Sequence, residues 1–249
     1  MVSSAKLLTV AIDGPAGAGK STVSKALAKR LGLTLVDTGA LYRSVALQAQ
    51  QAGVAWEADE EATLGKIART LDVRFDFDGG VNRVLLCGND VSTAIRTPEN
   101  SQGASKIATL PAVRAGLMDL QRTLANRQPG AVLEGRDIGT VVLPGASAKF
   151  FLTASLERRV KRRYDEVVAA GGATPDFEEL LAAERERDLR DSERATAPLK
   201  QADDAILVDS SALSADEVVE LMVQEISKRQ SSSDASPPPG PGPALVIGA

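Results

Sequence analysis

Short apolar runs alternate with amphipathic stretches along most of the chain. Nearly continuous apolar runs occur at residues 7–12, 34–36, 131–133, 148–152 and 205–208. Runs of this length without polar alternation are typical of strands that are buried on both faces, as in a parallel sheet. Because longer amphipathic stretches separate them, we predict an α/β fold in which helices cover a parallel sheet.

The amphipathic stretches predict helices between these strands. Val23, Leu27 and Leu31 recur at i, i+4 and i+8, and Gly32 follows as a stop signal. Ser155 and Ser214 stand where helix N-caps are expected. The predicted helices span residues 22–31, 39–51, 57–71, 100–108, 113–127, 155–164, 177–190 and 214–226.

The period of the pattern changes after residue 72. Residues 73–77 alternate between apolar and polar, residues 78–80 are a turn signal, and residues 83–87 supply a partner strand. Because an antiparallel hairpin does not fit a parallel core, we predict an inserted lobe at about residues 67–104. From residue 231 the composition shifts to Ser, Pro and Gly, which predicts a flexible tail over residues 231–249.

Composition limits the classes of function. The 249 residues are 43% hydrophobic, enough for one domain with an inserted lobe, and the net charge of −4 gives no field that attracts nucleic acid or an anionic membrane. Cys87 is the single cysteine and there is no histidine, which excludes an internal disulfide and a cysteine-built zinc site. We expect a cytoplasmic protein without a membrane span or a cleavable signal.

Residues 14–21 read GPAGAGKS and match the phosphate-binding pattern G-x-x-x-x-G-K-[ST]. The glycines let backbone N–H groups approach an anion at a helix N-terminus, where the helix dipole favours phosphate. Lys20 is expected to reach the β- and γ-phosphates, and Ser21 to ligate Mg²⁺. A chance glycine-rich turn is a poor alternative, because a predicted strand precedes the motif and a predicted helix follows it. The predicted nucleotide-binding residues are Gly14, Pro15, Ala16, Gly17, Ala18, Gly19, Lys20, Ser21 and Thr22.

Two further clusters follow predicted strands, the place where ligands bind in open α/β sheets. Asp37, Thr38 and Arg43 come after residues 34–36, and the forked donors of an arginine suit a phosphate. Taken alone, a surface helix with Thr38 as its N-cap explains this first cluster better. In the second cluster, EGRDIG at residues 134–139, we interpret Arg136 as a phosphate ligand and Asp137 as an acceptor for a substrate group, with a local salt bridge as the alternative.

Arginines concentrate at residues 158–163 and 185–194. Such runs of charge are usually solvated helix faces that carry ion pairs one turn apart. However, transfer of a phosphoryl group between two phosphate-bearing substrates requires positive charge around the migrating group once water is excluded. We expect both interpretations to hold, for different residues.

The ordered motifs resemble those of the bacterial cytidylate (CMP/dCMP) kinases, which are P-loop nucleoside monophosphate kinases. The motifs are IDGPAGAGKST, DTGALYR, DVRFDFDGGVNRVLLCGNDVSTAIRTPE, EGRDIGTVV and ERDLRDSERATAPL, and the similarity runs from about residue 6 to residue 229. The phosphate loop indicates only the superfold, whereas GRD-x-GTVV and RD-x-RD-x-x-R are far more specific. The resemblance implies a P-loop three-layer fold over residues 1–230, with a parallel core, an antiparallel nucleoside-monophosphate-binding lobe and a helical lid at about residues 155–190.

The resemblance also implies a reaction and its residues. The reaction is transfer of the γ-phosphoryl group of ATP to CMP or dCMP with Mg²⁺, in pyrimidine nucleotide metabolism, by a monomer that acts on small molecules. The implied catalytic residues are Lys20, Arg136, Arg159, Arg163 and Arg194, with Arg159 and Arg163 clamping the donor phosphates. The implied acceptor-site residues are Asp37, Thr38, Arg43, Ser105, Arg114, Arg136, Asp137, Arg187, Asp191 and Arg194, of which Ser105, Arg114 and Asp137 read the cytosine and Arg187 and Asp191 hold the sugar.

Two other functions share the phosphate loop. One is a kinase that acts on UMP, AMP or a small hydroxyl substrate. The other is a regulatory nucleotide switch, but the guanine-reading pattern N-K-x-D does not occur in the sequence. The missing histidine fits a phosphate acceptor, because its oxygen is already largely anionic near neutral pH and needs no general base.

Overall fold

The computed structural model describes residues 7–78, 81–169, 171, 174–233 and 246–247. The chain divides into two compact units, one formed by the residues up to Leu35 and from Ala125 onward, and the other by Val36–Leu124. The chain passes from the first unit into the second within strand β2 (Thr34–Asp37).

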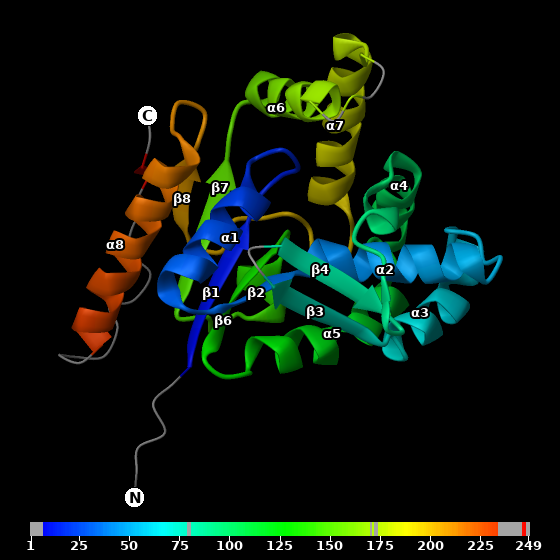
Figure 1. Ribbon diagram of the computed structural model, residues 1–249, viewed down its shortest axis with the longest axis horizontal. Helices are drawn as coiled ribbons and strands as arrows, with labels where there is room; N and C mark the ends of the chain where they lie inside the picture. Colours follow the sequence, from blue (N-terminus) through cyan, green and yellow to red (C-terminus); the bar gives the residue numbers. More distant parts are fainter. Residues whose placement is uncertain (1–6, 79–80, 170, 172–173, 234–245, 248–249) are drawn as a thin grey trace, which may run out of the picture. The chain divides into compact units, whose positions relative to one another are not determined.

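Parallel strands form the centre of the first unit. β1 (Leu8–Asp13) lies between β6 (Gly130–Gly135) and β7 (Ala148–Thr153), and β8 (Ile206–Asp209) pairs with the other edge of β7 (Figure 1). Every one of these pairings is parallel, which confirms the predicted sheet. The burial of β1 on both faces explains why its sequence is a continuous apolar run rather than an alternating one.

Two helices complete the core of the first unit. α1 (Lys20–Leu31) and α8 (Ala215–Ser233) pack against each other, and both contribute side chains to the cluster that covers the sheet (Figure 1). The cluster is aliphatic except for one aromatic ring. Its fully buried members include Val10, Ile12, Leu27, Val132, Phe150, Leu152 and Met222.

The first unit also carries a helical hairpin that follows β7. Its helices are α6 (Leu156–Ala169) and α7 (Phe177–Glu193), which contact each other (Figure 1). The Ser155 hydroxyl accepts a hydrogen bond from the backbone N–H of Arg158 at 3.2 Å, which confirms the predicted N-cap. Both helices run a few residues beyond their predicted ends.

The second unit contains α2 (Thr38–Gln51), α3 (Glu61–Arg69), α4 (Pro98–Ile107) and α5 (Pro111–Ala125). Trp56 holds α2 to α4. Its indole N–H donates to the carbonyl of Ala46 at 3.0 Å, and its ring lies where a side chain on Gly103 would have to be. α3 begins later than predicted, because residues 58–60 form a separate 3₁₀ turn.

A small antiparallel sheet belongs to the second unit. β3 (Val73–Asp78) pairs with β4 (Val81–Leu86), and β4 pairs with the short β5 (Asn89–Asp90). The predicted antiparallel segment is therefore present, while Gly79 and Gly80 of its predicted turn lie outside the described residues. β4 ends one residue earlier than predicted, because Cys87 has a positive φ of 48° and starts the turn to β5.

Two parts of the predicted tail, residues 231–249, have secondary structure, while residues 234–245 and 248–249 lie outside the described residues. α8 continues to Ser233, and the Ser231 hydroxyl donates to the carbonyl of Ser227 at 3.0 Å, one helical turn back. β9 (Val246–Ile247) pairs in parallel with the outer edge of β8. This strand lies in the apolar stretch ALVIG, which the average Ser, Pro and Gly content of the tail conceals. In the described part of the chain, no helix is long and apolar enough to cross a membrane.

Candidate active site

The predicted phosphate loop connects β1 to α1 in the first unit. Gly14 has a φ of 149°, and a Cβ at this position would lie 1.9 Å from the carbonyl oxygen of Leu152. Gly17 has a φ of 70°, and a Cβ there would lie 2.9 Å from the Cβ of Arg159. Gly19, also left-handed, precedes α1 as its N-cap. Glycines are therefore required both for the backbone path and for the close packing of neighbours on the loop.

Lys20 is the first residue of α1, and its side chain is buried against the loop. The ammonium group donates to the carbonyls of Gly14 at 2.8 Å and Pro15 at 2.7 Å. Burial lowers the pKa of Lys20 well below its usual value, and repulsion from Arg136 lowers it further, while Glu134 acts in the opposite direction. An anion bound at the loop would stabilise the charged form of Lys20.

Glu134, the penultimate residue of β6, belongs to the predicted EGRDIG cluster, but the sequence reasoning gave it no role. Its side chain is buried, and the Ser21 hydroxyl donates to its Oε2 at 3.0 Å. A hydroxyl and a carboxylate oxygen are the ligand types that Mg²⁺ prefers, so this pair fits the predicted metal ligand Ser21. Among the described residues, no group of three or more His, Cys, Asp or Glu could hold a metal by itself.

Asp13, the last residue of β1, holds the segment that follows β6. Its carboxylate accepts the backbone N–H groups of Ile138 at 2.8 Å and Gly139 at 2.7 Å, in the single π-helical turn Ile138–Val142. Burial raises the pKa of Asp13 to about 6, although the two N–H groups oppose the shift. The nearby Asp137 carboxylate adds to the rise, and Lys20 opposes it. Asp13 thereby fixes the backbone immediately after the predicted GRD ligands.

We expect Asp13 to make stability depend on pH. Because the pKa is about 6 in the folded protein and 3.8 as the ordinary value, the folded state binds the proton more tightly. The resulting stabilisation is full below pH 3.8 and is lost as the pH rises through about 6. Between about pH 5 and pH 7 the wild type should lose about 1 kcal/mol of unfolding free energy relative to Asp13→Asn. Urea unfolding of both proteins measures this difference, and a difference that does not vary with pH would contradict the raised pKa.

The two charged residues of the GRD segment bind partners on and just after α7. The Arg136 Nε donates to Asp191 at 2.7 Å, and Arg194 donates to Asp137 at 3.3 Å. Burial raises the pKa of Asp191, but the guanidinium groups of Arg136, Arg187 and Arg194 together more than offset this, and the net pKa lies below its usual value. These contacts are not the local salt bridge considered as the alternative, because each partner lies more than 50 residues away in the sequence.

The arginines of the predicted lid, in the first unit, have different environments. Arg159 is buried and binds Asp188 through two hydrogen bonds. Arg163 is half-buried and pairs with Glu166 at 3.3 Å, one turn along the same helix. Arg162, which the sequence reasoning did not select, donates to the Ala18 carbonyl at 3.2 Å and to the Ser210 carbonyl at 2.7 Å. Arg159 and Arg162 both contact the phosphate loop, through the carbonyls of Ala16 and Ala18, whereas Arg163 forms an ion pair within α6.

In the second unit, Asp37 and Arg43 form a charged pair at the start of α2. The Asp37 carboxylate accepts the N–H of Ala40 at 2.9 Å and the Arg43 guanidinium at 2.7 Å. Asp37 and not Thr38 is therefore the N-cap, while Thr38 is buried in the first turn. Arg96, a residue that the sequence reasoning missed, lies 3.8 Å from the same carboxylate. Two arginines share one carboxylate here, which leaves net positive charge for an anion.

Ser105 and Arg114, the predicted base-reading residues of the second unit, lie on α4 and α5. Both are buried. The Arg114 guanidinium donates to the Ala108 carbonyl at 3.1 Å and lies 5.7 Å from the centre of the Tyr42 ring. These contacts fix the guanidinium in one orientation, as a residue that recognises a planar base requires.

Residues 10–228 match the cytidylate kinase family. The chain belongs to this family. Curated cytidylate kinases include that of Syntrophotalea carbinolica, 48% identical over 229 residues, which cover 92% of this chain and 96% of that protein. The protein of Geobacter sp. strain M21 is 49% identical over 225 residues (90% and 95%). The protein of Pseudomonas aeruginosa strain PAO1 is 49% identical over 222 residues (88% and 95%).

For a member of the cytidylate kinase family, the structure gathers part of the predicted site in each unit. The first unit brings together the phosphate loop, the GRD segment and the end of α7. The second unit holds the cluster at the start of α2 together with Ser105 and Arg114. Glu134 and Asp13 could have been found as carboxylates that end buried strands next to a phosphate loop, whereas Arg96 carries no local signal.

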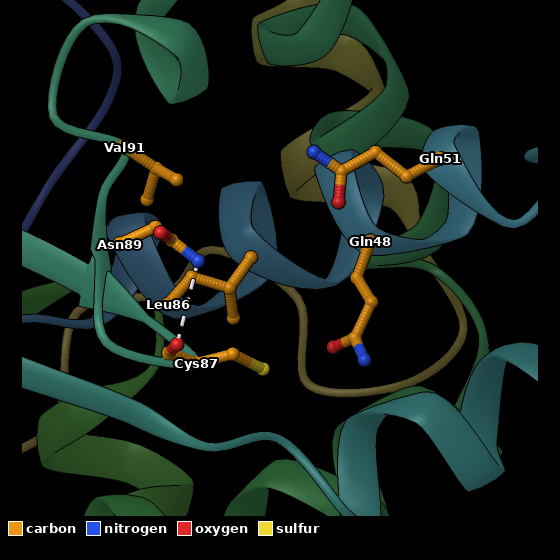
Figure 2. A pocket seen from close by; sticks show the side chains of 6 residues that line it. All are labelled: Gln48, Gln51, Leu86, Cys87, Asn89 and Val91. Carbon is orange, nitrogen blue, oxygen red and sulfur yellow. Dashed lines mark hydrogen bonds between the residues drawn. The ribbon is translucent and has the colours of Figure 1, made fainter.

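A surface pocket in the second unit is lined by none of the predicted site residues. Gln48 and Gln51 line it from α2, and Figure 2 shows the Gln48 amide across from the Cys87 thiol. The Asn89 amide donates to the Cys87 carbonyl at 3.4 Å. Leu86 and Val91 complete the lining. The lining is amide, thiol and aliphatic, so it offers no charged group for a phosphate.

Proposed function

We propose that the protein transfers the γ-phosphoryl group of ATP to CMP or dCMP, giving ADP and CDP or dCDP. The observation that carries this proposal is the charge cluster of the first unit. Lys20 lies in a glycine-rich loop at a helix N-terminus. Asp191 of the RD-x-RD motif binds Arg136, and Asp137 of the GRD motif binds Arg194. Membership of the cytidylate kinase family supports CMP as the acceptor.

The chemistry requires alignment and charge neutralisation rather than a general base. The attacking group is an oxygen of the acceptor phosphate, which is largely ionised near neutral pH. Arg136 and Arg194 would neutralise charge on the acceptor and on the migrating group, and Lys20 would do so on the donor. Asp191 binds Arg136, so the orientation of the guanidinium is fixed relative to α7.

We assign donor and acceptor roles to the residues as follows. ATP binds Gly14, Pro15, Ala16, Gly17, Ala18, Gly19, Lys20, Ser21 and Thr22, with support from Arg159 and Arg163. The acceptor binds Asp37, Thr38, Arg43, Ser105, Arg114, Arg136, Asp137, Arg187, Asp191 and Arg194. Arg96 joins the acceptor set, because it shares the Asp37 carboxylate with Arg43.

Mg²⁺ is the proposed cofactor, bound together with ATP. Ser21 and Glu134 would hold it, and when bound it neutralises negative charge on the donor phosphates. Glu134→Gln should raise the Mg²⁺ concentration for half-maximal activity by about tenfold or more, because a neutral amide is a weaker partner for the hydrated cation. Initial rates over a Mg²⁺ titration at saturating ATP and CMP measure this. Glu157→Gln, an exposed carboxylate on α6, is the matched control, and equal Mg²⁺ dependence in the two variants would remove Glu134 from the metal site.

The decisive experiment compares acceptors. Purified protein is given ATP, Mg²⁺ and one of CMP, dCMP, UMP or AMP, and formation of the nucleoside diphosphate is measured. CMP or dCMP should have the highest kcat/KM. Equal or better turnover of UMP or AMP would overturn the cytosine assignment, and slow ATP hydrolysis that no monophosphate changes would indicate a nucleotide switch.

The cellular setting follows from the same proposal. We place the enzyme in the cytoplasm, in pyrimidine nucleotide metabolism, acting as a monomer on small molecules without nucleic acid or membrane partners. The single cysteine and the net charge of −4 support this placement. Light scattering after size exclusion, where the monomer mass is 26.0 kDa, tests the oligomeric state.

A further inference from the structure

Two carboxylates on α7 each hold an arginine from a different part of the first unit. Asp188 holds Arg159 of α6, and Asp191, three residues later, holds Arg136 of the GRD segment. Side chains three residues apart project from the same face of a helix. One face of α7 is therefore tied both to the donor side and to the acceptor side of the proposed reaction.

Arg159 connects Asp188 directly to the phosphate loop. Its NH1 donates to the carbonyl of Ala16 at 3.0 Å and to Asp188 at 3.2 Å, and its NH2 donates to the other Asp188 oxygen at 2.5 Å. Its Nε donates to the Ala154 carbonyl at 3.1 Å. The guanidinium thus binds the Asp188 carboxylate through two nitrogens and also donates to two backbone carbonyls, one of them in the phosphate loop. Only a planar, forked group makes both sets of contacts at once.

The packing around this connection leaves little room for independent movement. The Arg159 side chain is 6% exposed and that of Asp188 is 27% exposed. The Arg159 backbone also lies against Gly17, where a Cβ would approach its Cβ to 2.9 Å. A displacement of the loop is therefore transmitted to Arg159, and through the bidentate pair to α7.

The second connection runs from α7 to the acceptor-binding arginine. The Asp191 side chain is 8% exposed and its Oδ2 accepts from Arg136 at 2.7 Å. The Asp191 carbonyl also accepts the N–H of Leu199 at 2.7 Å, which fixes the chain after the helix. A shift of α7 consequently changes the position of Arg136.

We propose that Asp188 is a positioning residue that couples occupancy of the donor loop to binding of the acceptor. This inference rests on the proposed function. Asp188 acts through Arg159 and touches neither nucleotide; the route is loop carbonyl, Arg159, Asp188, α7, Asp191 and Arg136. Binding of ATP sets the position of the loop, the loop sets the position of α7, and α7 presents Arg136 to the acceptor phosphate. Because binding linkage is reciprocal, CMP strengthens donor binding by the same factor.

The test measures this coupling directly. The CMP dissociation constant is determined by calorimetry with and without a saturating non-hydrolysable ATP analogue and Mg²⁺. The wild type should bind CMP at least about fivefold more tightly with the analogue. Asp188→Asn should reduce this ratio to less than about twofold, while CMP binding without the analogue changes less. Asp188→Glu, which keeps the carboxylate, should retain most of the coupling.

Three controls separate positioning from general damage. Asp165→Asn removes an exposed carboxylate of α6 that pairs with Lys161, and it should leave the ratio unchanged. Thermal unfolding shows whether each variant is folded. In a double-mutant cycle, Arg159→Gln combined with Asp188→Asn should be no worse than the more impaired single variant, because both break one connection.

The outcomes also distinguish this inference from the proposed function. A wild type that binds CMP equally with and without the analogue would overturn the coupling but leave the kinase reaction standing. Additive effects in the cycle, or an unchanged ratio in a folded Asp188→Asn protein, would likewise overturn it. Failure of the wild type to bind or phosphorylate CMP would remove the proposed function itself.

Discussion

Replacing Lys20 with alanine should lower kcat for phosphoryl transfer by at least about a thousandfold and leave the fold intact. The ammonium group is the buried cation of the phosphate loop, so its loss removes the charge that meets the developing charge of the donor phosphates. Stability should change little, because the buried ammonium is unfavourable in the absence of an anion, as its lowered pKa indicates. Coupled-enzyme rates and thermal unfolding of the purified variant measure the two effects.

The matched control for this prediction is Lys25→Ala. Lys25 lies on the exposed side of the same helix, α1, so the substitution removes an equal charge without touching the loop. Its kcat should stay within about twofold of the wild type. Comparable losses in the two variants would mean that α1 is perturbed in general, and retention of activity in Lys20→Ala would contradict the proposed donor site.

Replacing Asp137 with asparagine should raise KM for CMP by about tenfold or more while KM for ATP stays within about twofold. A carboxylate accepts a hydrogen bond from the exocyclic amine of cytosine, whereas uracil has a carbonyl at that position, which a carboxylate repels. An amide can donate to that carbonyl. The preference for CMP over UMP, measured as the ratio of kcat/KM values, should therefore fall by about 10- to 100-fold.

Asparagine tests this role more sharply than alanine, although both should raise KM for CMP more than KM for ATP. The side chains of Asp137 and Arg194 are 7% and 4% exposed and lie 3.3 Å apart. Alanine would leave Arg194 as a buried charge without this partner, a loss that costs about 3–5 kcal/mol in comparable pairs. An unchanged KM for CMP in a folded Asp137→Asn protein would remove Asp137 from the base pocket.

The elements of the fold were largely predictable because their signals are local. The continuous apolar runs identified the parallel strands, and the change to alternation after residue 72 identified the antiparallel sheet. Element ends were less predictable, since they depend on individual hydrogen bonds. Asp37 replaces Thr38 as the cap of α2, and α8 extends to Ser233, past the last apolar residue of its pattern.

The site was predictable as a set of ligands but not as a network. The phosphate loop and the GRD segment carry their chemistry in contiguous residues. The ion pairs that orient them are Arg136 with Asp191, 55 positions apart, and Arg194 with Asp137, 57 positions apart. No local spacing predicts which carboxylate binds which arginine. The contact between Arg159 and Asp188 was not predictable for the same reason. Arg159 was expected at the donor phosphates, but its guanidinium binds a carbonyl of the loop itself.

The second unit is one uninterrupted stretch of sequence, Val36–Leu124, which the first unit flanks on both sides. Such a stretch can be exchanged between relatives as a single cassette, by recombination or by gene synthesis. A transplant of this cassette would carry Ser105 and Arg114 into the recipient but leave Asp137 behind. Under the proposed base-reading roles of these three residues, transplanting the cassette alone should not transfer acceptor choice. New base preferences would then require a matching change in the GRD segment of the host chain.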